Sequence, residues 1–147
     1  MSRFTGEGLF MIYEKSCGAV IFTERDGRRL YLVERMRKGT HTSLCKGHVE
    51  GEETERQTAA REIREETGLE VEFVRGFRKT TEYSPCEGHW KTVVFFLARA
   101  STMDVTPQEE EVREIRWLPL RDAASALTFA SDRSILRRAD EFLKRLK

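Results

Sequence analysis

The hydrophobic and polar positions of this chain follow two periods, one typical of strands and one of helices. Residues 14–24 centre on the apolar run CGAVIF, and residues 29–34 read RLYLVE. The pair Asp26-Gly27 lies between them and favours a tight turn, so we expect a β-hairpin. Residues 36–46 are polar and predict a loop. Three further strands are expected at residues 70–83, 90–100 and 111–118, with turn signals at Ser84, Pro85, Gly88 and Pro119.

Apolar side chains recur at helical spacing in two longer segments. The first begins after Thr54, a favourable N-cap, with Gln57 three residues later in a capping-box pattern, and Gly68 ends it. Its expected buried stripe is Ala59, Ala60, Ile63 and Thr67. The second begins at a Ser131 or Asp132 cap and places on one face Ile135, Leu136, Ala139, Phe142, Leu143 and Leu146. Residues 120–127 indicate a short helix between them.

The order of these elements, strands with one helix in the middle and another at the end, favours the α/β class. It suits an α/β/α sandwich around a mixed β-sheet. A chain of 147 residues has the usual size of one domain and shows no internal repeat. We therefore expect a single domain over residues 13–147. Residues 1–12 carry two glycines and no clear period, which indicates a flexible or loosely docked lead-in.

Composition narrows the classes of partner. The formal net charge is +1, which gives no electrostatic argument for binding nucleic acid or a membrane. Cys17, Cys45 and Cys86 are odd in number and lack metal-ligand spacing, so we expect free thiols in a reducing compartment. The longest apolar runs are only a few residues, too short for a secretory signal or a membrane span. A cytoplasmic protein is therefore expected.

Residues 47–69 carry the most specific pattern in the chain. The spacing G-x5-E-x7-R-E-U-x-E-E-x-G-U, in which U is apolar, is occupied by Gly47, Glu53, Arg61, Glu62, Ile63, Glu65, Glu66, Gly68 and Leu69. On a helix Glu62, Glu65 and Glu66 stand at i, i+3 and i+4, so they converge on one surface, largely away from the buried stripe. Clustered carboxylates repel one another unless a cation lies among them, and Mg²⁺ prefers such oxygen ligands.

A solvated helix with surface ion pairs is the alternative interpretation, because 35% of the residues are charged. Arg61 and Glu65, at i and i+4, would then merely pair. Such a helix has no need of Gly47, Glu53 and Gly68 at fixed offsets. The spacing therefore favours a metal site.

The stretch resembles the Nudix box of the MutT-like hydrolases, and no specified position departs from it. That family hydrolyses phosphoanhydride bonds in a nucleoside diphosphate linked to another group, with Mg²⁺ or Mn²⁺ as cofactor. The resemblance implies that Glu62, Glu65 and Glu66 hold the metals together with the backbone carbonyl of Lys46. A metal-bound water would attack one phosphorus in line, without a Ser, Cys or His nucleophile.

The resemblance also assigns supporting roles. Glu53 would pair with Arg61 and fix the loop of the box against the helix. Glu111 matches the acidic residue that many members supply from outside the box, and its neighbours Glu109, Glu110 and Glu114 are alternatives. Glu62 in the first place, and Glu111 in the second, would take the proton of the attacking water.

Residues outside the box resemble one branch of the family. The matching features are SCGAVIF, KGHVEGEE, Tyr83 followed by Lys91, FFLA at 95–98, Glu111 six residues before Trp117, and ILRRADEFL. Together they are similar to the asymmetric diadenosine tetraphosphate hydrolases, which yield ATP and AMP. Cys45 stands where that branch has a proline, and Thr42 stands where it has an aromatic residue. Both differences lie on the substrate side of the site.

Four residues are candidates for substrate contact. Lys46 and Lys91 suit phosphate oxygens, with ordinary surface charges as the alternative. His48 would bond a phosphate or act only locally in its loop. Tyr83 would stack on a purine or serve as an ordinary aromatic at the end of a strand. Phe129 is a weaker stacking candidate, and we expect it in the core.

Three functions compete. The first is hydrolysis of a small-molecule dinucleoside polyphosphate. The second is the same chemistry on a diphosphoinositol polyphosphate, a nucleoside triphosphate or a 5′-capped RNA end. A diphosphoinositol enzyme would need a dense basic pocket, with Arg35, Arg37, Lys38, Arg78 and Lys79 as candidate members. The third is a non-catalytic nucleotide-binding module, which the intact R-E-U-x-E-E pattern argues against. The sequence carries no signal for the oligomeric state.

Overall fold

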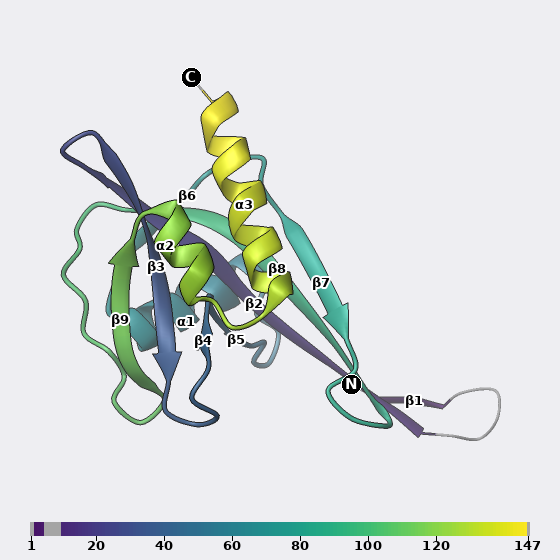
Figure 1. Ribbon diagram of the computed structural model, residues 1–147. Coiled ribbons are helices and arrows are strands. Elements are labelled where there is room, and N and C mark those ends of the chain that lie inside the picture. The colour runs from purple at the N-terminus through teal and green to yellow at the C-terminus, as the bar shows by residue number, and fades with distance from the viewer. Residues whose placement is uncertain (1, 5–9, 147) are drawn as a thin grey trace.

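A computed structural model describes residues 2–4 and 10–146 of the chain. The strands are β1 (Ser2–Phe4), β2 (Phe10–Arg25), β3 (Arg28–Met36), β4 (Thr42–Ser43), β5 (Cys45–His48), β6 (Val71–Phe73), β7 (Lys79–Tyr83), β8 (His89–Ala100) and β9 (Val112–Leu118). The helices are α1 (Glu55–Thr67), α2 (Leu120–Ala126) and α3 (Ala130–Arg145). In the described residues the strands form one mixed sheet (Figure 1).

Strand β2 is the centre of that sheet. It runs parallel to β8 from Ile12 to Phe22 and antiparallel to β3 from Phe22 to Arg25, and the second pairing confirms the predicted hairpin. Nearer its start, from Ser16 to Ala19, β2 pairs with β5 instead. Because β2 changes partner, β3 and β5 diverge, and within the described residues β5 pairs with β2 alone.

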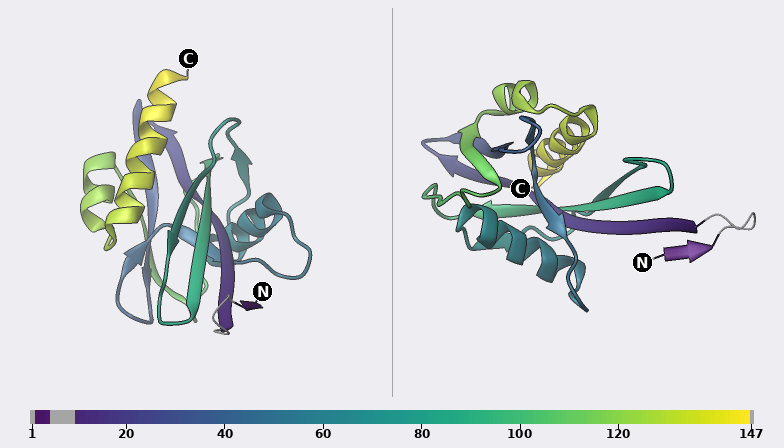
Figure 2. Two further views of the ribbon diagram at one scale, coloured as in Figure 1. Left: turned by 90° about the vertical axis from the view of Figure 1, so that its right-hand side faces the viewer. Right: turned by 90° about the horizontal axis from the view of Figure 1, so that it is seen from below.

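The sheet is covered on both faces, so the predicted α/β/α sandwich is confirmed. Figure 2 shows α1 against one face and α2 with α3 against the other. Successive side chains of a strand point to opposite faces. In β2, Cys17, Ala19 and Ile21 accordingly pack in the α1 layer, whereas Val20 and Phe22 pack under α2 and α3. This explains the nearly continuous apolar run in the sequence.

Helix α1 begins and ends as predicted. The hydroxyl of Thr54 accepts from the Gln57 amide at 3.2 Å, and the Gln57 side chain accepts from the Thr54 amide at 2.9 Å. Gly68 has φ 77°, a left-handed conformation that glycine adopts without steric cost, and its N–H bonds the carbonyl of Arg64. The helix therefore presents the predicted residues of the box in a defined register.

The face that α1 buries differs from the predicted one. Ala59, Ile63 and Thr67 are buried, but Ala60 is partly exposed. Glu62 and Glu66 are instead only 8% and 2% exposed. The expectation that the acidic surface lies away from the buried stripe is thus wrong for two of its three carboxylates. They lie over β5 and β3, where the diverging strands leave room beneath the helix.

Three other boundaries differ from the expectations. The 36–46 loop contains β4 and the start of β5, two pairings that no local period indicates. The strand expected over 70–83 is divided into β6 and β7, because Gly76 turns the chain at φ 96° and the ring of Phe77 packs edge-on against Phe142. Helix α3 begins at Ala130 rather than at a Ser131 or Asp132 cap, and Leu146 beyond its end is exposed.

The expected lead-in falls partly outside the described residues, which omit 1 and 5–9. Its described part is extended: Ser2–Phe4 pair antiparallel with Phe10–Ile12, and β2 begins at Phe10. Figure 1 shows this hairpin reaching beyond the body of the molecule. The three cysteines are free thiols, as predicted. In the part of the chain that the structure describes, no helix is long and apolar enough to cross a membrane.

Candidate active site

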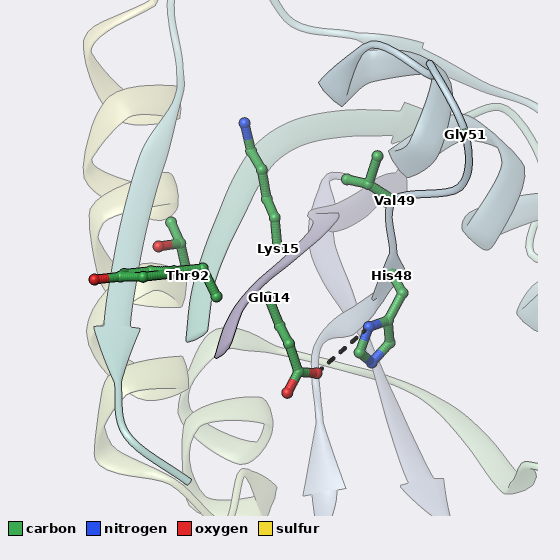
Figure 3. Close-up of a pocket in the computed structure, with 7 residues that line it drawn as sticks. Glu14, Lys15, His48, Val49, Gly51 and Thr92 are labelled. Carbon is green, nitrogen blue, oxygen red and sulfur yellow. Dashed lines mark ion pairs between the residues drawn. The ribbon is translucent and has the colours of Figure 1, made fainter. Parts of the chain in front are cut away.

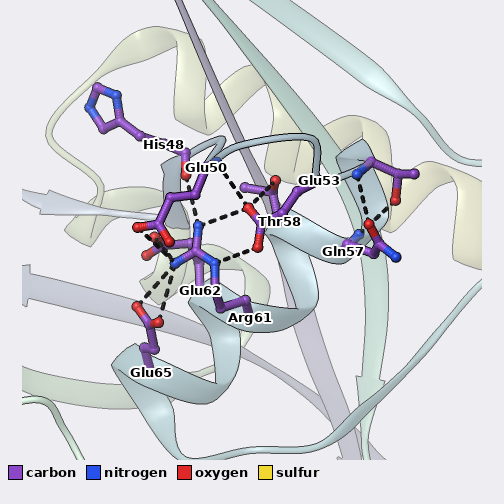
Figure 4. A network of polar contacts seen from close by, with 9 residues as sticks. His48, Glu50, Glu53, Gln57, Thr58, Arg61, Glu62 and Glu65 are labelled. Carbon is purple, nitrogen blue, oxygen red and sulfur yellow. Dashed lines mark hydrogen bonds and ion pairs between the residues drawn. The ribbon is translucent and has the colours of Figure 1, made fainter.

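Arg61 organises the loop of the box (Figure 4). Its Nε donates to Glu53 at 2.7 Å and its Nη2 donates to the carbonyl of His48 at 2.8 Å. Glu53 also accepts from the backbone amide of Glu50 and from the hydroxyl of Thr58. A guanidinium that reaches two segments of a loop at once holds them in one arrangement. Glu53 and Arg61 therefore make the contact that the box predicted.

The same contacts determine the charge of the loop. The hydrogen bond from Arg61 lowers the pKa of Glu53 to about 2, with further help from the Glu50 amide. The pKa of Arg61 is raised in turn, first by Glu53. Both side chains are therefore fully charged at neutral pH.

Two of the predicted metal ligands share the remaining donor of Arg61. Nη1 lies 2.9 Å from an oxygen of Glu62 and 3.1 Å from one of Glu65. The Glu65 side chain is 47% exposed, whereas that of Glu62 is 11% exposed. Glu62 lies so close to β5 that a Cβ on Gly47 would overlap its carboxylate carbon and both oxygens. The glycine that opens the box thus makes room for Glu62 beside the backbone of Lys46 and Gly47.

Glu66 turns inward from the same helix. One of its oxygens accepts from the thiol of Cys45 at 3.5 Å, and Glu34 of β3 lies beside them. Burial raises the pKa of Glu66, and the charges of Glu34 and Glu62 act in the same direction. Burial likewise raises the pKa of Glu34. Sequence reasoning missed Glu34, because a single acidic residue in an apolar strand carries no motif.

The donor set of the box fits a divalent metal ion. Glu62, Glu65 and Glu66 gather near one end of β5, and Arg61 is the cation that contacts the first two. Carboxylates gathered in this way repel one another and are stabilised by a bound cation, and oxygen ligands suit Mg²⁺ or Mn²⁺. The absence of a Gly47 side chain lets the Glu62 carboxylate lie directly against the backbone of β5.

The acidic segment before β9 reaches the end of α1. The amide of Gln108 donates to the carbonyl of Glu66 at 3.3 Å, and the carbonyl of Glu111 accepts from the amide of Arg37. The side chain of Glu111 is exposed, and among the described residues no contact joins its carboxylate to the box. The role of Glu111 remains a prediction.

A second part of the site is an aromatic pocket on the α3 side of the sheet. Its volume is about 260 Å³, and it is lined by Lys46, Thr81, Glu82, Tyr83, Val93, Phe95, Phe129, Ser131 and Asp132. Tyr83 and Phe129 are 44% and 49% exposed, unusual values for large aromatic side chains. The expectation that Phe129 lies in the core is therefore wrong: it precedes α3 at the rim, with its ring 5.5 Å from that of His41.

Two charged side chains are related to this pocket: Lys91, which is paired with a lining residue, and Asp132, which lines it. Lys91 stands opposite Tyr83 in the β7–β8 pair, and burial followed by the charge of Lys46 lowers its pKa. Asp132 is 5% exposed and accepts from the amide of Leu44 at 3.3 Å, so it ties α3 to the β4–β5 segment. Burial raises the pKa of Asp132. Sequence reasoning treated Asp132 only as a helix cap, because its contact with Leu44 spans 88 residues.

His48 lies away from this pocket. Figure 3 shows its ring turned toward Glu14. Its Nδ1 lies 3.9 Å from the Glu14 carboxylate, and both residues line a separate groove of about 580 Å³ together with Lys15 and Thr92. The carbonyl of His48 holds Arg61. A local structural role for His48 is thus visible, and a contact with phosphate remains a prediction.

The two parts of the site meet at β5. Cys45 and Gly47 point into the α1 layer, and Lys46 between them points into the aromatic pocket. A ligand that crosses the free edge of β5 would reach the box carboxylates and the aromatic pocket together. The geometry thus places a carboxylate cluster suited to a divalent ion across one strand from an aromatic pocket.

Comparison with known sequences gives the family. Residues 13–139 match the NUDIX domain family, so the chain belongs to the NUDIX family, as the box predicted. The chain is 33% identical over 140 residues to the asymmetrical bis(5′-nucleosyl)-tetraphosphatase of Sus scrofa, covering 88% of this chain and 95% of that protein. It is also 33% identical to the putative mutator protein MutT4 of Mycobacterium tuberculosis over 144 residues, or 92% of this chain, but it spans only 58% of that protein's length.

Comparison with solved structures leads to the same family. A binary complex of the Ap4A hydrolase of C. elegans superimposes with a TM-score of 0.82 at 29% identity, covering 89% of this chain and 98% of the other. The resemblance to the asymmetric tetraphosphatase branch is thereby confirmed.

Proposed function

We propose that this protein hydrolyses a dinucleoside tetraphosphate, with diadenosine tetraphosphate giving ATP and AMP. The observation that carries the proposal is the position of the aromatic pocket, across a single strand from the box carboxylates. A separation of one strand suits a ligand that has a base at one end and a chain of phosphates beyond it. The tetraphosphatase relatives, which this chain covers almost fully, support the same conclusion.

Glu62, Glu65 and Glu66 would hold Mg²⁺ or Mn²⁺, together with the backbone carbonyl of Lys46. The bound metal would neutralise charge on the phosphates and lower the pKa of a water. Glu62 is the preferred acceptor for the proton of that water, because its carboxylate lies against β5 and is held there by a hydrogen bond from Arg61. Glu111 is the second candidate. Glu53 and Arg61 would act as positioning residues, since they hold the loop rather than face the ligand.

The substrate contacts follow from the lining of the pocket. Tyr83 and Phe129 offer exposed ring faces on which a purine would stack. The carboxylate of Asp132 faces the same pocket and would accept from an exocyclic amino group. The positive charge of Lys46 lowers the pKa of Lys91, so the two ammonium groups repel each other. An anion between them would relieve that repulsion.

A diphosphoinositol polyphosphate is less suited to this surface. The basic residues that would bind it do not share a pocket: Arg78 is held by both oxygens of Glu55, and the guanidinium of Arg37 donates to the carbonyl of Glu109. Arg35 and Lys79 line separate depressions. A nucleoside triphosphate or a capped RNA end would use the same base pocket, so the choice among these substrates requires measurement.

A substrate panel tests the proposal. The full-length protein with Mg²⁺ is offered diadenosine tetraphosphate, ATP, ADP-ribose, a diphosphoinositol polyphosphate and a 5′-capped RNA, and the products are separated by chromatography. We expect the highest kcat/KM for diadenosine tetraphosphate. A higher value for any other member of the panel would overturn the substrate, and no turnover of any diphosphate would favour the non-catalytic module.

A further inference from the structure

Three ionisable side chains from different elements meet in the layer beneath α1. Glu34 comes from β3, Cys45 from β5 and Glu66 from α1, and one ligand atom from each lies within 4.8 Å of the others. All three are buried, with exposed fractions of 1%, 1% and 2%. Cys45 is also one of the positions at which the chain differs from the branch that it resembles. Only Glu66 belongs to the predicted metal set of the box.

The cluster has an unpaired acidic group at its centre. Neither carboxylate oxygen of Glu34 meets the geometry of a hydrogen bond, and its two nearest polar neighbours, Glu66 and Cys45, are acidic groups themselves. Buried carboxylates are normally hydrogen-bonded, ion-paired or bound to a metal. Among the described residues no Lys, Arg or His side chain makes an ion pair with Glu34 or Glu66. Lys46 follows Cys45 along β5, but its side chain lines the pocket on the opposite face of the sheet.

The ligand types indicate which cation would fit. Two carboxylates and a thiolate carry three negative charges, and a buried divalent ion would neutralise two of them. A thiolate is a soft ligand that Zn²⁺ and Co²⁺ accept, whereas Mg²⁺ prefers oxygen ligands alone. The three protein atoms leave a further position for a water or a backbone carbonyl.

We propose that Glu34, Cys45 and Glu66 form a buried site for a thiophilic divalent ion of the Zn²⁺ type. On binding, the protons held by the thiol of Cys45 and by the carboxyls of Glu34 and Glu66 pass to solvent, and the sulfur and the carboxylate oxygens bond the metal. Glu66 is also one of the three predicted metal ligands of the box. An ion at this buried site would therefore fix the orientation of the Glu66 carboxylate from the β3 side. The inference rests on the cluster alone and does not depend on the proposed substrate.

Cobalt absorption tests the site without an activity assay. The full-length protein is freed of metal with a chelator and titrated with Co²⁺, and the near-ultraviolet charge-transfer band of a thiolate–Co²⁺ bond is recorded. We expect a band that saturates at one equivalent, survives excess Mg²⁺ and disappears when Zn²⁺ is added. Cys45→Ser should remove the band, and Glu34→Gln should weaken Co²⁺ binding at least tenfold.

Two control variants exclude other origins. Cys17→Ser removes a second buried thiol of the α1 layer that lies outside the cluster, and it should retain the band. Glu65→Gln should retain it as well, because Glu65 lies outside the cluster. Circular dichroism verifies the folding of each variant.

Absence of the band in the wild-type protein, or its persistence in a folded Cys45→Ser variant, would overturn the site. Loss of the band in Cys17→Ser would assign it to the other thiol and overturn the site too. Hydrolysis of diadenosine tetraphosphate without a Co²⁺ band would leave the proposed function intact. A band without any hydrolysis would support this site and count against the proposed function.

Discussion

Substitution of Gly47 by alanine should separate catalysis from folding. The backbone of Gly47 is not in the left-handed region, so an alanine meets no conformational obstacle there. The obstacle is Glu62, whose carboxylate carbon and oxygens all lie well within 3.0 Å of the position that the new methyl group would take. Glu62 is the end of a flexible side chain, and we therefore expect the carboxylate to move while the strand remains in place.

The size of the effect follows from that displacement. The new methyl carbon would lie 1.9 Å from the carboxylate carbon. Non-bonded carbon atoms settle at about 3.5–4.0 Å, so the carboxylate must move by at least about 1.6 Å. It then loses its 2.9 Å contact with Arg61 and its place beside the backbone of β5. A misplacement of about 1 Å can lower a rate about 100-fold, or about 2.7 kcal/mol in the barrier. The lost hydrogen bond should lower the free energy of unfolding by only about 1–2 kcal/mol, because alanine also restricts the unfolded chain.

The assay is kcat/KM for diadenosine tetraphosphate at saturating Mg²⁺, with the unfolding midpoint in urea measured in parallel. Gly51→Ala is the matched control, from the turn that follows β5. Gly51 has φ 53°, so alanine is strained there by about 1–2 kcal/mol, but no atom lies within 4 Å of the new methyl group. We expect Gly51→Ala to lose stability and retain its rate. A folded Gly47→Ala variant with the wild-type rate would refute the assigned position of Glu62.

Three further predictions concern single residues. Glu65→Gln should leave folding nearly unchanged and lower kcat at least about 100-fold, because an amide does not replace a carboxylate on Mg²⁺; wild-type turnover at saturating metal would rule Glu65 out as a ligand. Tyr83→Ala should raise KM about 5- to 150-fold with little change in kcat, since stacking on a base contributes about 1–3 kcal/mol in ground and transition states alike; a change confined to kcat would argue against stacking. The pKa of Glu53 is lowered from 4.5 to about 2, so its contribution to stability is present above pH 4.5 and is lost as the pH falls toward 2. The difference in urea midpoint between wild type and Glu53→Gln should therefore shrink across that range, and a constant difference would contradict the pairing with Arg61.

Local patterns predicted the parts of the fold that depend on neighbouring residues. Thr54, Gln57 and Gly68 determine the ends of α1 through contacts within one or two turns, so the sequence places them correctly. The usual alternation of apolar and polar side chains is missing from the centres of β2 and β8. Helices cover both faces of the sheet, so nearly every residue there is apolar. The pairing of β5 with β2 was missed, since four residues are too few to show a period.

The sequence predicted the site residues that belong to a motif. It did not predict contacts between residues that are far apart along the chain and close only in the fold. The box identified Glu53, Arg61 and the three helical glutamates, because their spacing is specific. The spacing did not indicate that Glu66 turns inward to Glu34, which is 32 residues away along the chain. The contact of Asp132 with Leu44 was equally invisible, since it depends on how α3 docks on the sheet.

Hydrolysis of diadenosine tetraphosphate in ¹⁸O-labelled water tests the central claim most directly. If Tyr83 and Phe129 bind one adenosine while the box carboxylates hold the metal across β5, water should attack the fourth phosphorus counted from the bound nucleoside. The account predicts ATP and AMP in equal amounts, with the label in AMP, and no turnover without a divalent metal. Two molecules of ADP, or label in ATP, would contradict the proposed binding of the substrate across β5.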